Sequence, residues 1–176
     1  MTTSKIQTRD MVTAALCTAV IAVCSQTTVP MPGGVPVTLQ TFAIALCGFL
    51  LAPKFAVAAV TVYLLLGAVG VPVFAGLSGG FSALVGVTGG FLWGFLAFVL
   101  LSALTKKKLP SLGLSLVGLL VCHLAGILQY MLLMHSGFVE TALLVSVPFL
   151  LKDVVSVILA LLLAMRLRPI LRLSEQ

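Results

Sequence analysis

The stretch PFLLKDVVSVILALLLAMRL, residues 148–167, is apolar enough to cross a membrane, yet it carries two adjacent charged residues, Lys152 and Asp153. The hydrocarbon core of a bilayer is about 30 Å thick, and a helix needs about 20 mainly apolar residues to cross it. A lysine or an aspartate at the centre of such a helix costs roughly 2.5 to 3.5 kcal/mol, so these residues usually face a cavity, a ligand or another helix. The pair is therefore the first candidate for a functional site.

The whole chain has the composition of an integral membrane protein. Of its 176 residues, 61% are hydrophobic and only 8% are charged, and the mean hydropathy is +1.27. The net charge of +6 is compatible with binding to nucleic acid, but the basic residues lie at the ends of apolar segments, where they act as topology signals. We therefore expect one all-α membrane domain over residues 1–176, with no nucleic-acid partner.

The apolar segments predict six transmembrane helices, which places both termini on the same side of the membrane. The expected ranges are 11–29, 37–52, 55–71, 88–104, 112–134 and 148–167. Basic residues accompany the termini and every second junction: Lys5, Arg9, Lys54, Lys106, Lys107, Lys108, Arg166, Arg168 and Arg172. The other junctions, 30–36, 72–87 and 135–147, contain no lysine or arginine. By the positive-inside rule, the termini are cytoplasmic and the protein is a multi-pass protein of the cell membrane.

Two polar positions are expected at similar depth in the outward half of the bundle. Proline suits the first turn of a helix, so Pro148 is expected to start the last helix, with 135–147 as an outer loop or surface helix. At 1.5 Å per residue, Asp153 then lies roughly 7 Å inside. Counted from Pro36 in the same way, Gln40 lies roughly 6 Å inside.

Small residues recur at helical spacing and allow other helices to approach closely. The sets are Ala15, Ala19 and Ala22; Gly86, Gly90 and Gly94; and Gly118, Cys122 and Gly126. For the two glycine sets we favour packing inside the bundle, since small residues are common wherever membrane helices touch. The alanine set follows the basic N-terminal residues, where a partner subunit could dock.

The segment 76–90, GLSGGFSALVGVTGG, is too rich in glycine for a regular helix facing lipid. Irregular backbone at membrane depth is tolerated only against protein or a cavity. The segment is either a plain outer loop or a source of backbone N–H and C=O groups for a small polar ligand. The chain contains no G-x-x-x-x-G-K-[ST] motif, so we do not expect it to hydrolyse ATP itself.

Several of these motifs resemble one family. PVTLQT at 36–41, LLLGAVGVPVFAG at 64–76, TGG at 88–90, and Pro148-Phe149 followed by Asp153 are similar to the BioY family, the biotin-binding S components of energy-coupling factor transporters. The resemblance covers nearly the whole chain. Family members often carry a lysine three residues after the aspartate, whereas this chain has Ser156 there and its lysine at Lys152.

The resemblance implies a membrane subunit that captures biotin from outside for uptake driven by ATP. Its partners would be a transmembrane coupling subunit and two ATPase subunits, and it would have no enzymatic activity, cofactor or metal of its own. Family members dock on the coupling subunit through an alanine-rich face of the first helix, which matches Ala15, Ala19 and Ala22.

Biotin offers a ureido ring with two N–H donors and one carbonyl acceptor, an apolar ring and chain, and a carboxylate. Asp153 is the expected ureido acceptor, and Lys152 could meet the carboxylate, although neighbours on a helix diverge by about 100°. The other expected contacts are polar groups and walls from four segments: Gln40, Thr38, Thr88, Gly89, Gly90, Phe74, Tyr63 and, as a further possible wall, Trp93. The roof is expected from 29–36 and 76–87.

Each assignment has an alternative. Lys152 could extend to the outer interface, Asp153 could bond Gln129 or Tyr130 of another helix, and Gln40 could cap a helix. Tyr63 and Trp93 are more often packing or interface residues. His123 and His135 show no metal-ligand spacing and receive no role.

Alternative functions also stay open. An S component for thiamine or riboflavin would share this architecture, and a structural membrane subunit would bind no small molecule. The sequence offers no paired carboxylates, no nucleophile beside a base and no metal ligands in support of an intramembrane enzyme.

Overall fold

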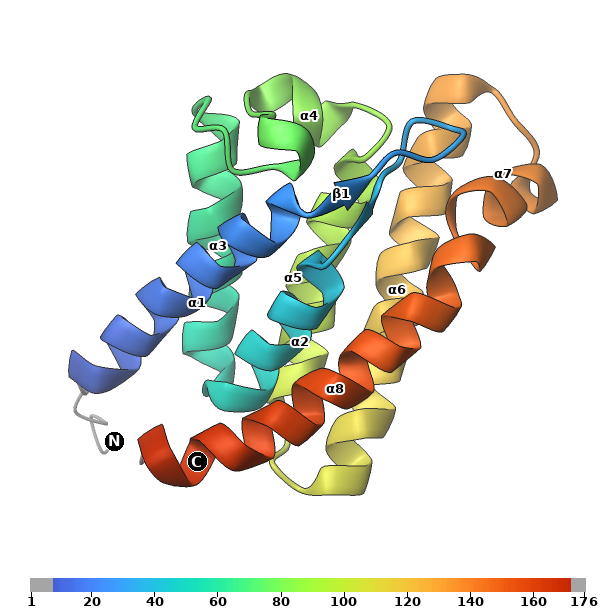
Figure 1. The fold of residues 1–176 in the computed structure, drawn as a ribbon. Coiled ribbons are helices and arrows are strands. Elements are labelled where there is room, and N and C mark those ends of the chain that lie inside the picture. The colour runs from blue at the N-terminus through green and yellow to red at the C-terminus, as the bar shows by residue number, and fades with distance from the viewer. Residues whose placement is uncertain (1–7, 172–176) are drawn as a thin grey trace, which may run out of the picture.

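The computed structural model describes residues 8–171, most of which lie in helices (Figure 1). In chain order the elements are α1 (Thr8–Gln26), β1 (Thr28–Val29), β2 (Val37–Thr38), α2 (Gln40–Leu50), α3 (Pro53–Ala68), η1 (Ala75–Leu77), α4 (Phe81–Val85), α5 (Gly89–Ala103), α6 (Lys108–Met134), α7 (Phe138–Val145) and α8 (Val147–Leu171). Lys5 and Arg172, two of the basic residues that predict the orientation, lie outside the described residues.

The helices of the described chain fall into two length classes. Helices α1, α6 and α8 are long and apolar enough to cross a membrane. Helices α2, α3 and α5 are apolar but shorter, with 11, 16 and 15 residues. At 1.5 Å per residue these three are roughly 17 to 24 Å long, less than the about 30 Å of a bilayer core. The crossing of the membrane by all six helices therefore stays a prediction.

Glycines bring α5 and α6 into close contact. A side-chain carbon added to Gly94 would meet the backbone of Cys122, and one added to Gly118 would meet the backbone of Phe98. The same holds for Gly90, which faces the backbone of Ala125. Packing between helices, favoured from the sequence for the glycine sets, is therefore confirmed for Gly90, Gly94 and Gly118.

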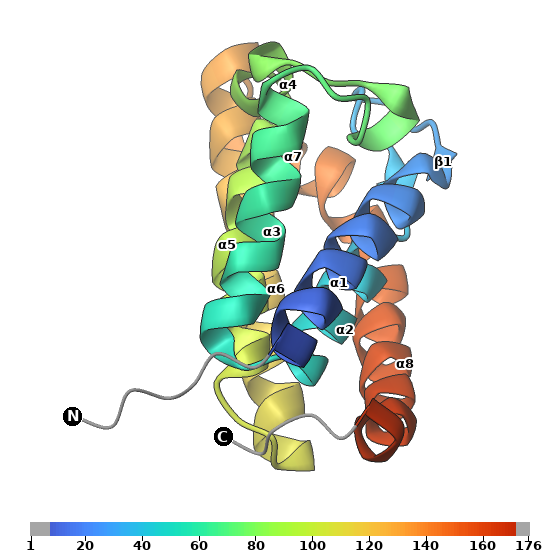
Figure 2. The same ribbon diagram turned by 90° about the vertical axis from the view of Figure 1, so that its left-hand side faces the viewer.

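The helices form two groups, and α3 belongs to the same group as α5 and α6. Figure 2 shows α3, α5 and α6 on one side, and α1, α2 and α8 on the other. Helix α2 packs against both α8 and α5 and so joins the two groups. Phe49 of α2, Phe98 of α5 and Tyr63 of α3 are completely buried in the core between them. Burial of such large apolar side chains fixes the relative positions of the helices.

Residues 37–39 are not helical, which corrects the expected start of the second span. Val37 and Thr38 pair with Val29 and Thr28 in an antiparallel hairpin, so their backbone groups are committed to a strand. Helix α2 therefore begins at Gln40, which is its first residue rather than one four residues inside it. In the turn of the hairpin, Gly33 and Gly34 have φ values of 95° and 76°, which favour glycine.

The segment expected as an outer loop or surface helix contains a short helix, α7. The helical conformation is interrupted at Ser146, whose φ and ψ are −130° and −60°, and α8 begins at Val147. This break turns the Ser146 side chain toward α6, where its hydroxyl meets His123.

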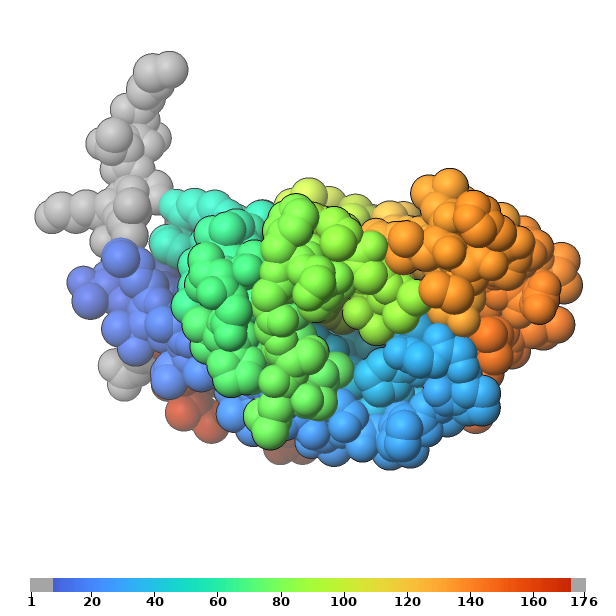
Figure 3. Space-filling view, turned by 90° about the horizontal axis from the view of Figure 1, so that it is seen from above, coloured from blue at the N-terminus to red at the C-terminus, as the bar shows by residue number. Residues whose placement is uncertain are grey.

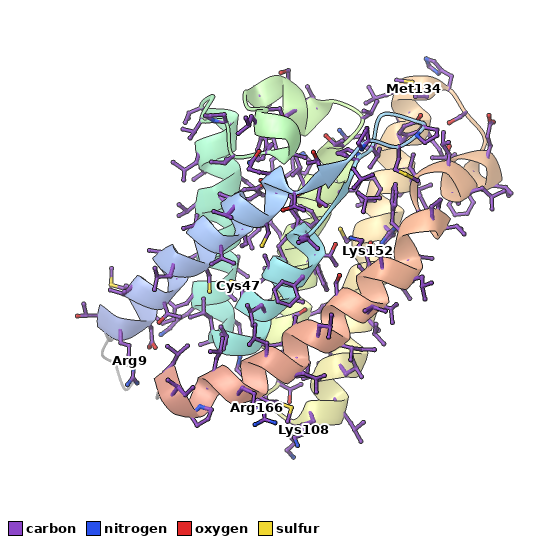
Figure 4. The ribbon with its side chains drawn as sticks, in the orientation of Figure 1. Arg9, Cys47, Lys108, Met134, Lys152 and Arg166 are labelled. Carbon is purple, nitrogen blue, oxygen red and sulfur yellow. The ribbon has the colours of Figure 1, made fainter. Side chains whose placement is uncertain are left out.

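The basic residues gather at one end of the molecule. Arg9, Lys108 and Arg166 lie at the lower end in Figure 4, opposite Met134 at the end of α6. At this lower end, Lys106 Nζ donates to the carbonyls of Leu51, at 2.5 Å, and Gly48, at 3.2 Å. Arg168 Nε donates to the carbonyl of Phe49, at 2.9 Å. These two cations therefore cap the C-terminus of α2, where a helix dipole favours positive charge.

Candidate functional site

A cavity of about 480 Å³ lies between the upper ends of α2, α5, α6 and α8 and the segments that cover them. Its volume is in the range of small-molecule sites in proteins. Figure 3, viewed from above, shows a hollow between the hairpin, in light blue, and the η1–α4 segment, in green. The residues that line the roof come from both segments predicted to form it: Gly34, Val35, Pro36, Ser78, Gly79, Ser82, Ala83, Gly86 and Val87.

The deeper wall of the cavity is mainly apolar. It consists of aromatic and aliphatic side chains from α5, α6 and the start of α8: Phe91, Leu92, Phe95, Phe98, Leu119, Cys122 and Phe149. Phe74, predicted as a wall, also lines the cavity, from the segment just before η1. Such a surface suits the apolar part of a ligand, while the few polar side chains fix its orientation.

Lys152 and Asp153 both line this cavity. Asp153 is 4% exposed, and its Oδ1 forms an ion pair with the Lys152 ammonium. Lys152 Nζ also donates to the carbonyl of Thr38, at 2.8 Å, so it bridges α8 and the hairpin. The flexible stem of the lysine overcomes the divergence expected for neighbours on a helix.

Gln40 and Thr38 form a second polar group in the wall. Thr38 Oγ1 donates to Gln40 Oε1, at 3.2 Å, and accepts from the Gln40 backbone N–H, at 3.3 Å. Gln40 Nε2 donates to the hydroxyl of Tyr63, at 2.6 Å. The amide of Gln40 is therefore held in a fixed orientation in the wall of the cavity that Asp153 also lines.

Tyr63 does not line the cavity, although it was predicted as a wall. It is completely buried behind Gln40 and meets the ring of Phe74 edge to face, with centroids 5.5 Å apart. Its place is thus behind two cavity residues, each of which it orients. Trp93, the other possible wall, is 47% exposed and faces away, with its indole N–H donating to the Leu84 carbonyl.

The three residues of the TGG motif have different surroundings. Thr88 lines the cavity, whereas Gly89 and Gly90 do not. The N–H of Gly89 donates to the Gly86 carbonyl, and Gly90 packs against α6 at Ala125. The two glycines therefore shape the α5–α6 contact beside the cavity.

His123 is a site residue to which the sequence pattern assigns no role. It is 5% exposed, lines the cavity, and its Nε2 lies 3.1 Å from Asp153 Oδ2. Its Nδ1 lies 2.8 Å from the hydroxyl of Ser146. Gln129, considered as a partner of Asp153, instead donates to the carbonyls of Leu84 and Gly86. One signal was available, since an ionisable side chain inside an apolar segment needs a partner.

The described residues offer no set of three or more side chains that could hold a metal ion. On the outside of the bundle, Ala15 and Ala19 are exposed on α1, and Ala22 is half-buried against the core. Two of the three alanines predicted to form the docking face are thus exposed.

Comparison with known proteins assigns this arrangement to a family. The sequence model of the BioY family matches residues 1–173. The chain belongs to the BioY family. The fold agrees, since the structure superimposes with a TM-score of 0.84 on the S-component for biotin from an ECF-type ABC transporter. That match is 24% identical in sequence and covers 96% of this chain and 95% of the other.

Two BioY relatives match along almost their full length. A probable biotin transporter of Pyrococcus horikoshii is 36% identical, over 93% of this chain and 98% of the relative. A biotin transporter of Thermotoga maritima is 35% identical, over 92% of this chain and 97% of the relative. The sequence similarity to these two relatives therefore extends over almost the whole of each protein.

Proposed function

We propose that this protein is the S component of an energy-coupling factor transporter and that it captures biotin from outside the cell. The observation that carries the proposal is the mainly apolar cavity with a buried aspartate, Asp153, in its wall. A carboxylate at this depth needs a strong partner, and it accepts N–H groups well. Membership of the BioY family supports biotin as the ligand.

The chemistry of biotin fits the cavity residues. Asp153 accepts a ureido N–H, and Gln40, Thr38 and Thr88 supply further donors and acceptors for the ring. The aromatic wall that includes Phe74 receives the apolar ring and chain. Lys152 meets the carboxylate after leaving the carbonyl of Thr38. Tyr63, Gly89 and Gly90 do not touch biotin in this proposal. Tyr63 orients Gln40 and Phe74, and the two glycines shape the packing of α5 against α6.

In the membrane, we propose six crossings with the cavity end outside and both termini in the cytoplasm. The collection of basic residues at the opposite end of the bundle supports this orientation. The covering segments, 30–36, 72–87 and 135–147, carry no lysine or arginine. The location is the cell membrane.

The partners in this proposal are a transmembrane coupling subunit and two ATPase subunits. The exposed Ala15 and Ala19 on α1 suit close approach of a helix of the coupling subunit. The loaded S component presents biotin inward only when ATP hydrolysis in the partners drives the complex. Isolated protein is therefore expected to bind biotin without transporting it.

Purified protein tests this proposal directly. The protein is extracted in detergent, any bound small molecule is released and identified by mass, and biotin, thiamine and riboflavin are then titrated by calorimetry. We expect biotin alone to bind. Binding of thiamine or riboflavin instead would reassign the ligand, and binding of none of the three would favour a structural subunit.

A further inference from the structure

The imidazole of His123 is fixed by partners from three different elements. Ser146, at the break between α7 and α8, meets Nδ1, and Asp153 of α8 meets Nε2. Phe91 of α5 meets the ring edge to face, with centroids 5.8 Å apart and an angle of 88°. A buried ring held on both nitrogens and one face has a single orientation. It is therefore suited to hold another side chain in place.

The chemistry of the partners determines where the proton lies. The Asp153 carboxylate only accepts hydrogen bonds, so His123 Nε2 must carry hydrogen and donate to Oδ2. In the neutral ring, Nδ1 then has a lone pair, which accepts from the Ser146 hydroxyl. In the protonated ring the hydroxyl rotates and accepts instead. In both states Oδ2 receives the same N–H group.

The two oxygens of Asp153 therefore have different roles. Oδ2 is occupied by His123. Oδ1 is itself buried and is paired with the Lys152 ammonium, and the Thr41 side chain, which also lines the cavity, interacts with the same carboxylate. Lys152 has a flexible stem and its side chain is 29% exposed, so it can move aside, whereas the buried ring cannot. Oδ1 is thus the oxygen that a ligand can reach once Lys152 has moved aside.

We propose that His123, oriented by Ser146, is a positioning residue for ligand binding: it holds Asp153 Oδ2 and so presents Oδ1 to an N–H group of the ligand. This inference rests on the proposed function, in which Asp153 accepts from the ureido ring. His123 itself need not touch the ligand. Loss of the His123 side chain weakens binding because the Asp153 carboxylate can then adopt other orientations.

The test measures biotin affinity by calorimetry for wild type, His123→Leu, His123→Gln and Ser146→Ala. Glutamine keeps an N–H donor close to the position of Nε2, whereas leucine keeps only the volume. We expect His123→Leu to weaken binding about 10-fold and Ser146→Ala about 3-fold, with His123→Gln within about 3-fold of wild type. His135→Asn is the matched control. His135 lies in a left-handed conformation at the end of α6, which asparagine tolerates, and we expect no change.

A double-mutant cycle separates positioning from general destabilisation. In an Asp153→Asn background, His123→Leu should cost little further affinity, because the acceptor that it positions is already lost. Thermal unfolding shows which variants fold. If His123→Leu does not fold, Ser146→Ala carries the test, and an unchanged biotin affinity in that variant overturns the inference.

Three results would overturn the inference: unchanged affinity in the leucine variant, no rescue by glutamine, or equal losses in both backgrounds. If wild-type protein binds no biotin, the proposed function fails and the inference fails with it. Wild-type binding together with an unaffected leucine variant overturns the inference alone.

Discussion

Helix α2 meets a cation of α8 at each of its ends, and the two ends differ in what accompanies the charge. At the lower end, Arg168 and Lys106 donate to the last carbonyls of α2. At the upper end, Lys152 donates to the carbonyl of Thr38, just before the helix begins, and also pairs with Asp153. A helix dipole favours positive charge at the C-terminus and disfavours it at the N-terminus.

The difference explains why only one end is a candidate site. The lower cations are satisfied by backbone carbonyls, and neither Lys106 nor Arg168 lines the cavity. The upper cation is balanced by the Asp153 carboxylate, and both of these side chains line the cavity in which we propose that the ligand binds. The lower cluster should therefore contribute to stability and the upper cluster to binding.

The largest expected effect is at the upper end. Asp153→Asn should weaken biotin binding about 100-fold, because a hydrogen bond to a charged group contributes about 1.5–3 kcal/mol. Calorimetry with purified protein measures the change. Glu140→Gln makes the same change of charge at an exposed position of α7 and should leave affinity within about twofold. An Asp153→Asn affinity within twofold of wild type would remove the aspartate from the site.

The lower end should show the opposite behaviour. Arg168→Met removes the donors to the Phe49 carbonyl and should lower the free energy of unfolding by about 2 kcal/mol, with biotin affinity within about threefold. Denaturant unfolding in detergent measures the first quantity and calorimetry the second. Arg166→Met, at an exposed position two residues earlier, should change neither. A loss of affinity as large as that of Asp153→Asn would end the distinction between the two clusters.

A smaller effect is expected at Lys152. Lys152→Met should weaken biotin binding about 5-fold, because an ion pair between the partly exposed Lys152 side chain and the biotin carboxylate contributes about 1 kcal/mol. Biotin methyl ester, which has no carboxylate charge, should bind the variant and the wild type about equally. Calorimetry with both ligands makes the comparison. A variant that still prefers the acid to the ester would place the carboxylate elsewhere.

The smallest effect is expected behind the cavity wall. Tyr63→Phe removes the hydroxyl that accepts from Gln40 Nε2 and should weaken biotin about 3-fold, because the amide loses one fixed partner while the ring packing remains. Titration calorimetry again measures the affinity. A loss above tenfold would mean that Tyr63 contacts the ligand directly.

Part of the upper site could be predicted from the sequence because charge inside an apolar segment is visible without a structure. Such charge, or the sequence motifs, predicts six site residues that all line the cavity: Lys152, Asp153, Gln40, Thr38, Thr88 and Phe74. The partnership of His123 with Asp153 could not be predicted, since the two residues are 30 positions apart and meet only when α6 and α8 pack.

The helix pattern was predictable to a similar extent. Hydropathy marks the apolar segments, but it does not show that Val37 and Thr38 pair with the preceding strand. That pairing moves the start of α2 to Gln40. The position of Tyr63 behind Gln40 also depends on how α3 packs against its neighbours, which periodicity alone does not determine.

A structure of the protein with biotin bound tests the central claim most directly. The account predicts biotin in the cavity, with a ureido nitrogen within about 3.2 Å of an Asp153 carboxylate oxygen and the lower cluster of Lys106 and Arg168 unchanged. Biotin bound outside this cavity, or bound within it with the Asp153 carboxylate turned away from the ureido ring, would contradict the account.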